Sequence, residues 1–342
     1  MIKKFDEVFV DKTRLGKKIP KEEYKKKGKY IIIDQGKDKI AGFTDNEDGI
    51  FTDVPTIIFG DHTRIIKYID KPFFLGADGV KVLKSKTNNA NYKYLYYALK
   101  AAYIPNTGYN RHFKWLKKVS INYPSFEKQK RIVKLLDNLS EVKNKKNEEL
   151  KLCDTLIKAR FVEMFGDPIC NSKNKSTTKF INVVKLQRGF DLPIRKRNTQ
   201  GKIPVYGSNG VLGYHDEFKA SSGIITGRSG TIGKVYYENN EFWPLNTALF
   251  SVKTYGNNII YLKYLVSLFK LERFCNGAGV PTLNRNNVHK QKIIDIPIKE
   301  QNKFASFVQQ VDKSKVVNAS IMKYIISIRF YLYFKENKEG AR

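Results

Sequence analysis

Cysteine and histidine are scarce in this sequence of 342 residues. The three cysteines, Cys153, Cys170 and Cys275, lie far apart, so they predict neither a disulfide framework nor a Cys-x-x-Cys metal pair. This usage indicates a reducing compartment. Metal sites need clustered ligands, but the four histidines are isolated from one another: His62, His112, His215 and His289. We therefore expect no metal site.

Long apolar runs are absent as well. The longest, residues 324–334, has 11 residues and contains Arg329, so it is too short to span a bilayer. The N-terminal segment MIKKFDEVFV lacks the apolar core that a signal peptide carries. We expect a cytoplasmic protein with no membrane partner.

Acidic residues are the third shortage. Asp and Glu number 33 against 63 Lys and Arg, which gives a net charge of +30. Such a charge is unusual for a metabolic enzyme and predicts a polyanionic partner, either nucleic acid or an anionic membrane surface. At 41% hydrophobic and 13% aromatic residues, the chain can form a core, which excludes global disorder. We favour nucleic acid, and binding to it should weaken steeply with salt.

Proline and glycine are missing from two stretches, and this absence divides the chain. Residues 126–165 contain neither and predict one long helix, which Gly166 and Pro168 should end. A second such stretch covers residues 299–335. We therefore expect a globular block, a long helix, a polar linker, a second globular block, and a second long helix with the C-terminal tail: residues 1–125, 126–165, 166–178, 179–297 and 298–342.

The two halves of the sequence resemble each other. After a shift of 172 residues, FEKQKRIVKLLDNL from Phe126 falls on IKEQNKFASFVQQV from Ile298, and Gln129 meets Gln301. The matching segments keep one order over almost the whole chain, and the offset changes in loops, where insertions are tolerated. The sequence therefore predicts an α+β fold with two globular mixed α/β domains in tandem repeat.

Apolar residues in both helical stretches recur at alternating spacings of four and three, the pattern of a coiled-coil seam. Polar residues interrupt the two seams at matching places, Lys143/Lys146 and Lys315/Asn318. We therefore expect the helices to pair with each other; the alternative is that each packs only on its own block. The predicted seam consists of Ile132, Leu136, Leu139, Leu150 and Ile157 in the first helix and of Phe304, Val308, Val311, Met322 and Ile325 in the second.

The positive charge is concentrated outside these helices. Residues 126–165 hold ten basic and seven acidic residues, and residues 299–342 hold nine and four. A basic coiled coil that grips DNA would carry the charge on its helices instead. The globular blocks should therefore face the phosphates, with the helices as a spacer.

Motifs for catalysis are missing. The run from Gly227 to Lys234 resembles a phosphate-binding loop, but five residues separate Gly227 from Gly233 and Val235 follows the lysine, so the Walker pattern fails. The run is either a turn whose backbone N–H groups and basic side chains contact DNA, or an ordinary glycine-rich hairpin. There is no G-x-S-x-G elbow, no dinucleotide fingerprint and no Asn-Pro-Pro-Tyr-type methyltransferase motif. We expect no catalysis by this chain alone.

Polar and aromatic clusters in the predicted turns could contact bases. Arginine suits guanine, and asparagine or glutamine suits adenine, each through two hydrogen bonds. The candidates in the first block are Gln35, Lys37, His62, Arg64, Tyr109, Asn110, Arg111 and His112. Those in the second block are Ser208, Asn209, Tyr214, Arg228, Thr231, Lys234, Asn246, Thr247, Asn284, Arg285 and Asn286. For each residue, a solvated turn or a phosphate contact is the alternative.

Several segments resemble the specificity subunit of type I restriction-modification systems. They are IPVYGSNGVLGYHDEF from Ile203, ITGRSGTIGKVYY from Ile225, FWPLNTALF from Phe242, PSFEKQKRIV from Pro124 and RFVEMFGDP from Arg160. The resemblance covers almost the whole chain. It implies two target recognition domains, each for one half of a bipartite, asymmetric DNA target. It also implies that the long helices form an antiparallel coiled coil, which spaces the half-sites and docks the methyltransferase subunits.

The resemblance further implies that this chain binds no cofactor and performs no chemistry. S-adenosylmethionine would bind the modification subunits, and ATP and Mg would serve the restriction subunit. The expected partners are double-stranded DNA, the modification subunits and the restriction/translocase subunit. Two departures from the family pattern stand out: Ile33-Asp34-Gln35-Gly36 replaces the family's Y-G-x-N-G, and the end of the second helix is rich in β-branched and aromatic residues.

Two other hypotheses remain. A compact nuclease or methyltransferase with unrecognised motifs would bind S-adenosylmethionine or cut DNA with a metal ion. A DNA-binding regulator would bind its target tightly without partners.

Overall fold

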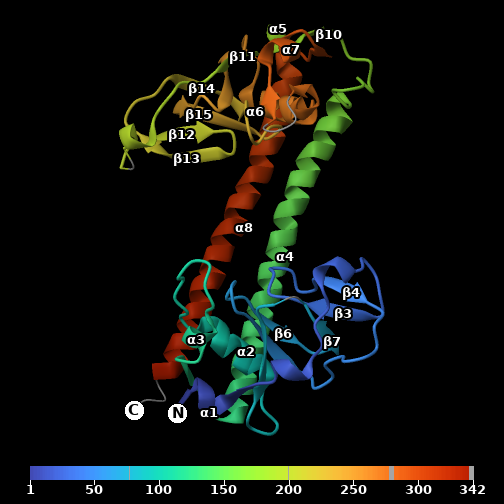
Figure 1. Ribbon diagram of the computed structural model, residues 1–342. Coiled ribbons are helices and arrows are strands. Elements are labelled where there is room, and N and C mark those ends of the chain that lie inside the picture. The colour runs from blue at the N-terminus through green and yellow to red at the C-terminus, as the bar shows by residue number, and fades with distance from the viewer. Residues whose placement is uncertain (77, 199, 277–280, 339–342) are drawn as a thin grey trace. The chain divides into compact units, whose positions relative to one another are not determined.

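A computed structural model describes residues 1–76, 78–198, 200–276 and 281–338. The chain forms two compact units: residues 1–145 with the C-terminal stretch from Ile321, and residues 146–320. The long helices α4 (Phe126–Phe165) and α8 (Ile298–Lys338) are each continuous and contribute to both units (Figure 1). Side chains at residue 322 and at residues 325–338 lie outside the description, and with them the predicted seam residues Met322 and Ile325.

Unit 1 contains a four-stranded sheet of order β2-β8-β5-β6, a three-stranded sheet of order β4-β3-β7 and the pair β1-β9. The strands are β1 (Ile2–Lys4), β2 (Phe9–Asp11), β3 (Tyr30–Ile33), β4 (Gly42–Thr44), β5 (Thr56–Gly60), β6 (Ile66–Ile69), β7 (Phe73–Leu75), β8 (Val80–Ser85) and β9 (Ser120–Asn122). The helices besides α4 are α1 (Phe5–Val8), α2 (Tyr92–Ala101) and α3 (Phe113–Leu116), with short 3-10 turns at Thr13–Leu15 and Lys21–Glu23.

The central strand β5 is a continuous apolar run because both of its faces are covered. Its residues alternate between two cores: Ile57 packs with Tyr94 of α2, and Ile58 packs with Phe73 of β7. Both faces of the strand are covered, so every residue from Thr56 to Gly60 is buried.

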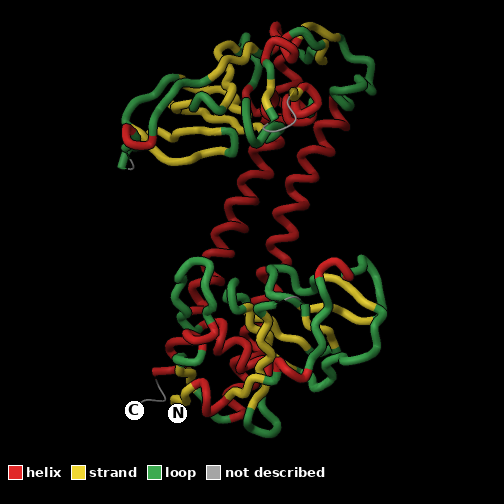
Figure 2. The backbone as a smooth tube through the Cα atoms, viewed as in Figure 1, coloured by secondary structure: helices red, strands yellow, loops and turns green. Residues whose placement is uncertain are grey.

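Unit 2 is built on a six-stranded sheet of order β11-β16-β14-β15-β12-β13, with the pairs β10-β19 and β17-β18 (Figure 2). Its strands are β10 (Thr177–Lys179), β11 (Lys185–Arg188), β12 (Ile203–Gly207), β13 (Gly210–His215), β14 (Ala220–Gly227), β15 (Val235–Pro244), β16 (Ala248–Lys253), β17 (Cys275–Asn276), β18 (Thr282–Leu283) and β19 (Lys292–Ile294). Its further helices are α5 (Phe180–Val183), α6 (Ile259–Leu268) and α7 (Arg285–His289), with 3-10 turns at Ile194–Lys196 and Leu271–Phe274.

The two units repeat one plan. The antiparallel pairs β1-β9 and β10-β19 are equivalent, and β5 lies between β8 and β6 as β14 lies between β16 and β15. Helices α2 and α6 each follow an asparagine cap, Asn91 and Asn258, whose side-chain oxygen accepts backbone N–H groups of the first turn. The predicted α+β class with two globular units in tandem and two long helices is confirmed.

The start and end of α4 follow from local chemistry. Near its start, the Gln129 side-chain amide donates to the Pro124 carbonyl oxygen at 2.9 Å. At its end, Gly166 adopts a φ of +83° and its N–H donates to the Val162 carbonyl oxygen at 2.8 Å. A left-handed residue at this place is the usual glycine cap, so the helix ends where the sequence predicts.

Inside unit 2, α4 and α8 run antiparallel. Phe165, at the end of α4, has its ring centroid 5.8 Å from that of Phe304, near the start of α8. Asp154, earlier in α4, contacts Lys315, further along α8, at 2.7 Å. The predicted pairing of the helices is therefore present in unit 2. The start of each helix also packs on its own block, since Ile132 joins the core of unit 1 and Phe304 contacts Tyr264 of α6. The end of α4 packs on the second block, where Phe161 stacks on Tyr261.

The burial of the predicted seam is uneven. Leu136, Ile157, Phe304 and Val308 are buried, while Ile132, Leu139, Leu150 and Val311 are half-buried. In the same helices, Leu152 and Leu156 lie outside the seam and are more than half exposed.

The spacing changes at the end of α4. A continued heptad would place Arg160 and Met164 on the seam, but the fully buried residues are Phe161 and Phe165. Here the helix packs on the core of unit 2 as well as on α8, so it buries a face wider than a coiled-coil seam.

Lys315 interrupts the seam with an ion-pair cluster. Its Nζ lies 2.7 Å from Asp154 Oδ1 and 3.0 Å from Asp312 Oδ1. Burial lowers the pKa of Lys315, but the two carboxylates outweigh that effect and raise it above its usual value. Polar residues at a seam position commonly fix the register of paired helices.

The Phe161→Ala substitution tests whether the long helices depend on the core of unit 2. Phe161 is fully buried among Phe165, Tyr261 and Phe304, so we expect the free energy of unfolding of unit 2 to fall by about 3–5 kcal/mol. Urea denaturation followed by circular dichroism measures this change. The matched control is Leu152→Ala in the same helix, for which we expect a loss below about 1 kcal/mol. Equal losses of unfolding free energy in the two variants would contradict the conclusion that the long helices depend on the core of unit 2.

Candidate nucleic-acid interface

In unit 2, four loops meet beside the ends of the sheet strands and form what we call the second loop cluster: residues 207–210, 228–234, 245–247 and 281–284. The Arg228 N–H donates to the Thr247 carbonyl oxygen at 2.8 Å, and the Leu283 N–H donates to the Arg228 carbonyl oxygen at 2.8 Å. Lys234 Nζ donates to Asn209 Oδ1 at 2.7 Å. Backbone and side-chain bonds thus hold several of the predicted residues of this unit in one place.

The glycine-rich run from Gly227 to Lys234 is the hairpin connection between β14 and β15. A Cβ on Gly227 would lie 1.8 Å from the Thr231 carbonyl oxygen, so only glycine fits. The N–H groups of Arg228 and Ser229 donate to Thr247, and that of Gly230 donates to Pro281. Neighbouring loops therefore already use these three N–H groups, so in the folded chain they serve the loop cluster rather than a phosphate.

Arg228 has the geometry of a residue that contacts bases. Its Nε donates to the Asn246 carbonyl oxygen at 2.8 Å, which fixes the plane of the guanidinium. Within the described part of the chain, its two terminal nitrogens donate no hydrogen bond. Two free, co-oriented donors suit the two acceptors of guanine in the major groove.

The remaining candidate residues of unit 2 lie in different places and have different partners. The side-chain amide of Asn246 donates to Asp191, and Asn284 caps α7 by accepting the Asn286 N–H. Tyr214 is 46% exposed, but it pairs with Pro204 four residues along β13 from the turn, so it lies apart from the second loop cluster. The others are half-buried or exposed within the cluster or next to it: Ser208, Asn209, Thr231, Lys234, Thr247, Arg285 and Asn286.

Unit 1 carries an equivalent first loop cluster: residues 34–36, 60–65, 78–79 and 105–112. The Gly76 N–H donates to Ile33 and the Leu245 N–H donates to Tyr206, both at 2.8 Å, which places Gln35 where unit 2 has Ser208. A Cβ on Gly60 would meet Gln35, as one on Gly227 would meet Ser208. The two clusters are therefore structurally matched.

Gln35 joins the loops of this cluster. Its Nε2 donates to the Asp78 carbonyl oxygen at 3.1 Å, and its Oε1 accepts the His62 N–H at 3.1 Å. Each end of the amide therefore has one partner within the cluster, and the Oε1 contact helps to position His62.

His112 is not on the surface, which corrects the prediction for this residue. It is 0% exposed, its Nδ1 lies 3.0 Å from the Asp61 carbonyl oxygen, and its Nε2 lies 3.3 Å from Thr107 Oγ1. An imidazole with a partner on each nitrogen is a structural link between two loops.

The neighbours of His112 are exposed. Tyr109 is 90% exposed and stacks on His62, with ring centroids 4.9 Å apart and an interplanar angle of 15°. Asn110 and Arg111 are also exposed. An exposed tyrosine stacked on a half-buried histidine, beside an arginine, suits contact with bases or sugars.

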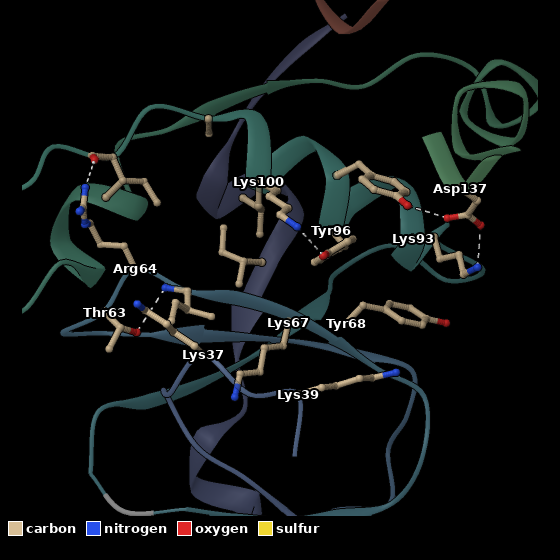
Figure 3. Close-up of a pocket in the computed structure, with 16 residues that line it drawn as sticks. Lys37, Lys39, Thr63, Arg64, Lys67, Tyr68, Lys93, Tyr96, Lys100 and Asp137 are labelled. Atoms are coloured by element: carbon tan, nitrogen blue, oxygen red, sulfur yellow. Dashed lines mark hydrogen bonds and ion pairs between the residues drawn. The ribbon is translucent and has the colours of Figure 1, made fainter. Parts of the chain in front are cut away.

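Lys37 and Arg64 belong to a cavity of about 700 Å³ beside the first loop cluster (Figure 3). Sequence patterns did not identify its other charged lining residues: Lys39, Lys67, Lys93, Lys100 and Asp137. The lysines are widely spaced in the sequence and carry no motif, so only the fold brings them together. Burial and the hydrogen bond to Asp137 raise the pKa of Tyr97, which also lines the cavity, to about 12.

No helix in the described part of the chain is long and apolar enough to cross a membrane. No group of three or more His, Cys, Asp or Glu among the described residues could hold a metal ion.

The family model of the type I restriction modification DNA specificity domain matches residues 1–152 and 172–323. The chain belongs to this family. Each match covers one globular block and the first part of the long helix that follows it. One specificity domain therefore corresponds to one copy of the internal repeat. The matched loop clusters are therefore candidate DNA interfaces.

Solved structures show the same fold. The chain is similar to the crystal structure of a type I restriction-modification S subunit from M. genitalium, with a TM-score of 0.61 and 18% identity over 97% of this chain and 94% of that one. It is also similar to a structure that describes complex assembly and conformational transition of the type I R-M system, with a TM-score of 0.57 and 13% identity over 98% and 96%. Among curated proteins, no match is found.

The Arg228→Lys substitution tests base contact by the second loop cluster. Lysine keeps the charge but loses the two-pronged donor, so we expect binding of the target duplex to weaken by about 1–3 kcal/mol with little change for unrelated DNA. Fluorescence anisotropy of the assembled complex measures both affinities. The matched control is Arg195→Lys at an exposed arginine of the same unit. An equal loss on target and unrelated DNA would assign Arg228 to phosphate instead.

Proposed function

We propose that this chain is the DNA sequence-specificity subunit of a type I restriction-modification complex. Each unit contacts one half of a bipartite, asymmetric target through its loop cluster. The long helices set the distance between the half-sites and scaffold the modification and restriction subunits. The observation that carries the proposal is the repeat itself: two matched loop clusters, each built on a specificity domain that continues into a long helix.

The sequences of the two clusters support an asymmetric target. Gln35 and His62 of unit 1 correspond in position to Ser208 and to the loop after Gly227 in unit 2. Different side chains at equivalent places present different hydrogen-bond patterns to the groove, so the two half-sites should differ.

The chemistry of the complex is assigned to its partners. The sequence lacks the motifs of a methyltransferase or a nuclease, and S-adenosylmethionine would bind the modification subunits. ATP and Mg would act in the restriction subunit. One of the similar structures is described by its complex assembly, which supports the scaffold role for the paired helices of this chain.

Co-expression with the methyltransferase subunit from the same genome tests the proposal. We expect long-read sequencing of the host DNA to show methylated adenines in one bipartite motif with a fixed gap. A stable complex without methylation would overturn the proposed function, and tight target binding by the lone chain would favour the solitary regulator. S-adenosylmethionine binding or metal-dependent DNA cutting by the purified chain would favour an enzyme.

Lengthening both helices tests their role as a spacer. The Asp154–Lys315 contact implies that Leu150 and Asn318 lie at about the same level, so seven residues inserted after each keep the heptad register. At about 1.5 Å per residue the helices lengthen by about 10 Å, and we expect the gap of the motif to grow by about three base pairs, at about 3.4 Å each.

The bases of both half-sites should stay the same in this variant. The matched control carries the insertion in α4 only, which shifts one helix against the other and should abolish methylation. An unchanged gap in an active double-insertion variant would contradict the spacer role.

A further inference from the structure

The cavity of unit 1 lies at the open edge of its larger sheet. Strand β6 is the last strand of the order β2-β8-β5-β6, and its residues Ile66, Lys67 and Tyr68 line the cavity. Figure 3 shows Lys93, Tyr96 and Lys100 on α2, Asp137 on α4, and Lys37 and Lys39 on the loop after β3. Three separate segments therefore supply positive charge to one concave surface.

Two of the lysines have carboxylate partners. Lys93 Nζ contacts Asp137 at 2.7 Å. Lys67 extends toward Asp34, with its Nζ 2.8 Å from the Asp34 carbonyl oxygen and 3.4 Å from the carboxylate. Burial lowers the pKa of Lys67, and the Asp34 carboxylate opposes that effect only in part.

The other cations lack a carboxylate. Lys37, Lys39, Arg64 and Lys100 form no salt bridge with any residue that the structure describes. Arg64 donates to the Ile104 carbonyl oxygen at 3.1 Å, and Lys100 donates to the Tyr96 hydroxyl at 2.9 Å. Both are thus held in place by neutral groups, and their charge remains available to an anion.

The cavity adjoins the first loop cluster. Thr63 lines the cavity, and its hydroxyl donates to the Gln35 carbonyl oxygen at 2.6 Å. The adjacent residue His62 does not line the cavity and stacks on Tyr109. Phosphates border the groove in which bases are contacted, so a duplex seated on the first loop cluster brings one strand's backbone to the cavity.

Unit 2 lacks the lysines of α2 and of the loop after β3 at the equivalent positions. The asparagine caps align α2 with α6, so Lys93 corresponds to Ile260 and Lys100 corresponds to Ser267. The long loop that carries Lys37 and Lys39 corresponds to the tight turn between β12 and β13. The cationic cavity is therefore a property of unit 1 and not of the repeat.

We propose that this cavity binds the phosphate groups of a nucleotide, and that the ligand is the DNA backbone next to the half-site of unit 1. This inference rests on the proposed function and adds an asymmetry to it: unit 1 contacts the backbone through a cavity for which unit 2 has no equivalent set of lysines. The competing explanation is that lysines protect the open β6 edge from pairing with another chain, which requires no contact with DNA.

The salt dependence of DNA binding separates these explanations. The variant Lys39→Gln with Lys100→Gln removes two cavity cations that were not among the predicted base contacts. Its control, Lys26→Gln with Lys27→Gln, removes two exposed lysines of the same unit that do not line the cavity. Both variants are assembled with the modification subunits, and binding to a target duplex and to an unrelated duplex is measured from about 50 to about 200 mM salt.

We expect the slope of log K against log salt to become shallower by about one for each phosphate that the variant no longer neutralises. This change should occur on both duplexes in the cavity variant and not in its control. An unchanged slope in the cavity variant would overturn the proposal, and so would an equal change in the control. Failure of the proposed function has a different sign: the wild-type complex would then methylate no bipartite motif. In that case the salt dependence on the unrelated duplex still tests the cavity.

A titration with 2′-deoxyadenosine triphosphate distinguishes the source of the phosphate. We expect no saturable binding by calorimetry, because the cavity meets the backbone only when a duplex is seated beside it. Saturable binding that disappears in the cavity variant, with an unchanged DNA slope, would overturn the assignment to the backbone and identify a free nucleotide as the ligand.

Discussion

A buried glutamine at the start of each long helix is the constraint on which the arrangement of each unit depends. Gln129 and Gln301 are 2% and 1% exposed, and each donates its side-chain amide to a carbonyl oxygen five residues earlier, at Pro124 and at Ile296. Gln301 also accepts the N–H of Asn258, the residue that caps α6. A buried N–H group without a partner would carry a desolvation cost, so these hydrogen bonds tie the first turn of each helix to the segment before it.

This constraint connects the cores to the surfaces. In unit 2, the helix that Gln301 fixes packs through Phe304 against α4 and α6, and the sheet beside α6 carries the second loop cluster. In unit 1, the helix that Gln129 fixes supplies Asp137 to the cavity of the β6 edge. The glutamine contact therefore fixes a helix that packs the core in unit 2, and in unit 1 it fixes a helix that carries a charged residue of the cavity.

Side chains that looked alike in the sequence have different roles once folded. Gln35 and His112 belong to a polar cluster rich in candidates, yet both use their polar atoms inside the protein. Arg228 keeps its terminal nitrogens available because a loop carbonyl accepts its Nε. Spacing along the chain does not show which polar atoms will find partners, because those partners come from loops far away in the sequence.

The sequence by itself determined the long helix between Phe126 and Phe165, the tandem repeat and the excess of positive charge outside the helices. These are properties of composition and local periodicity: the absence of proline and glycine, the recurrence of apolar residues, and one repeated order of segments. Only the tertiary structure decided that Phe161 and Phe165 replace the heptad positions, that His112 is buried, and that Lys39 and Lys100 share a cavity. Each of these depends on contacts between residues distant in the sequence, where packing and hydrogen-bond satisfaction outweigh local pattern.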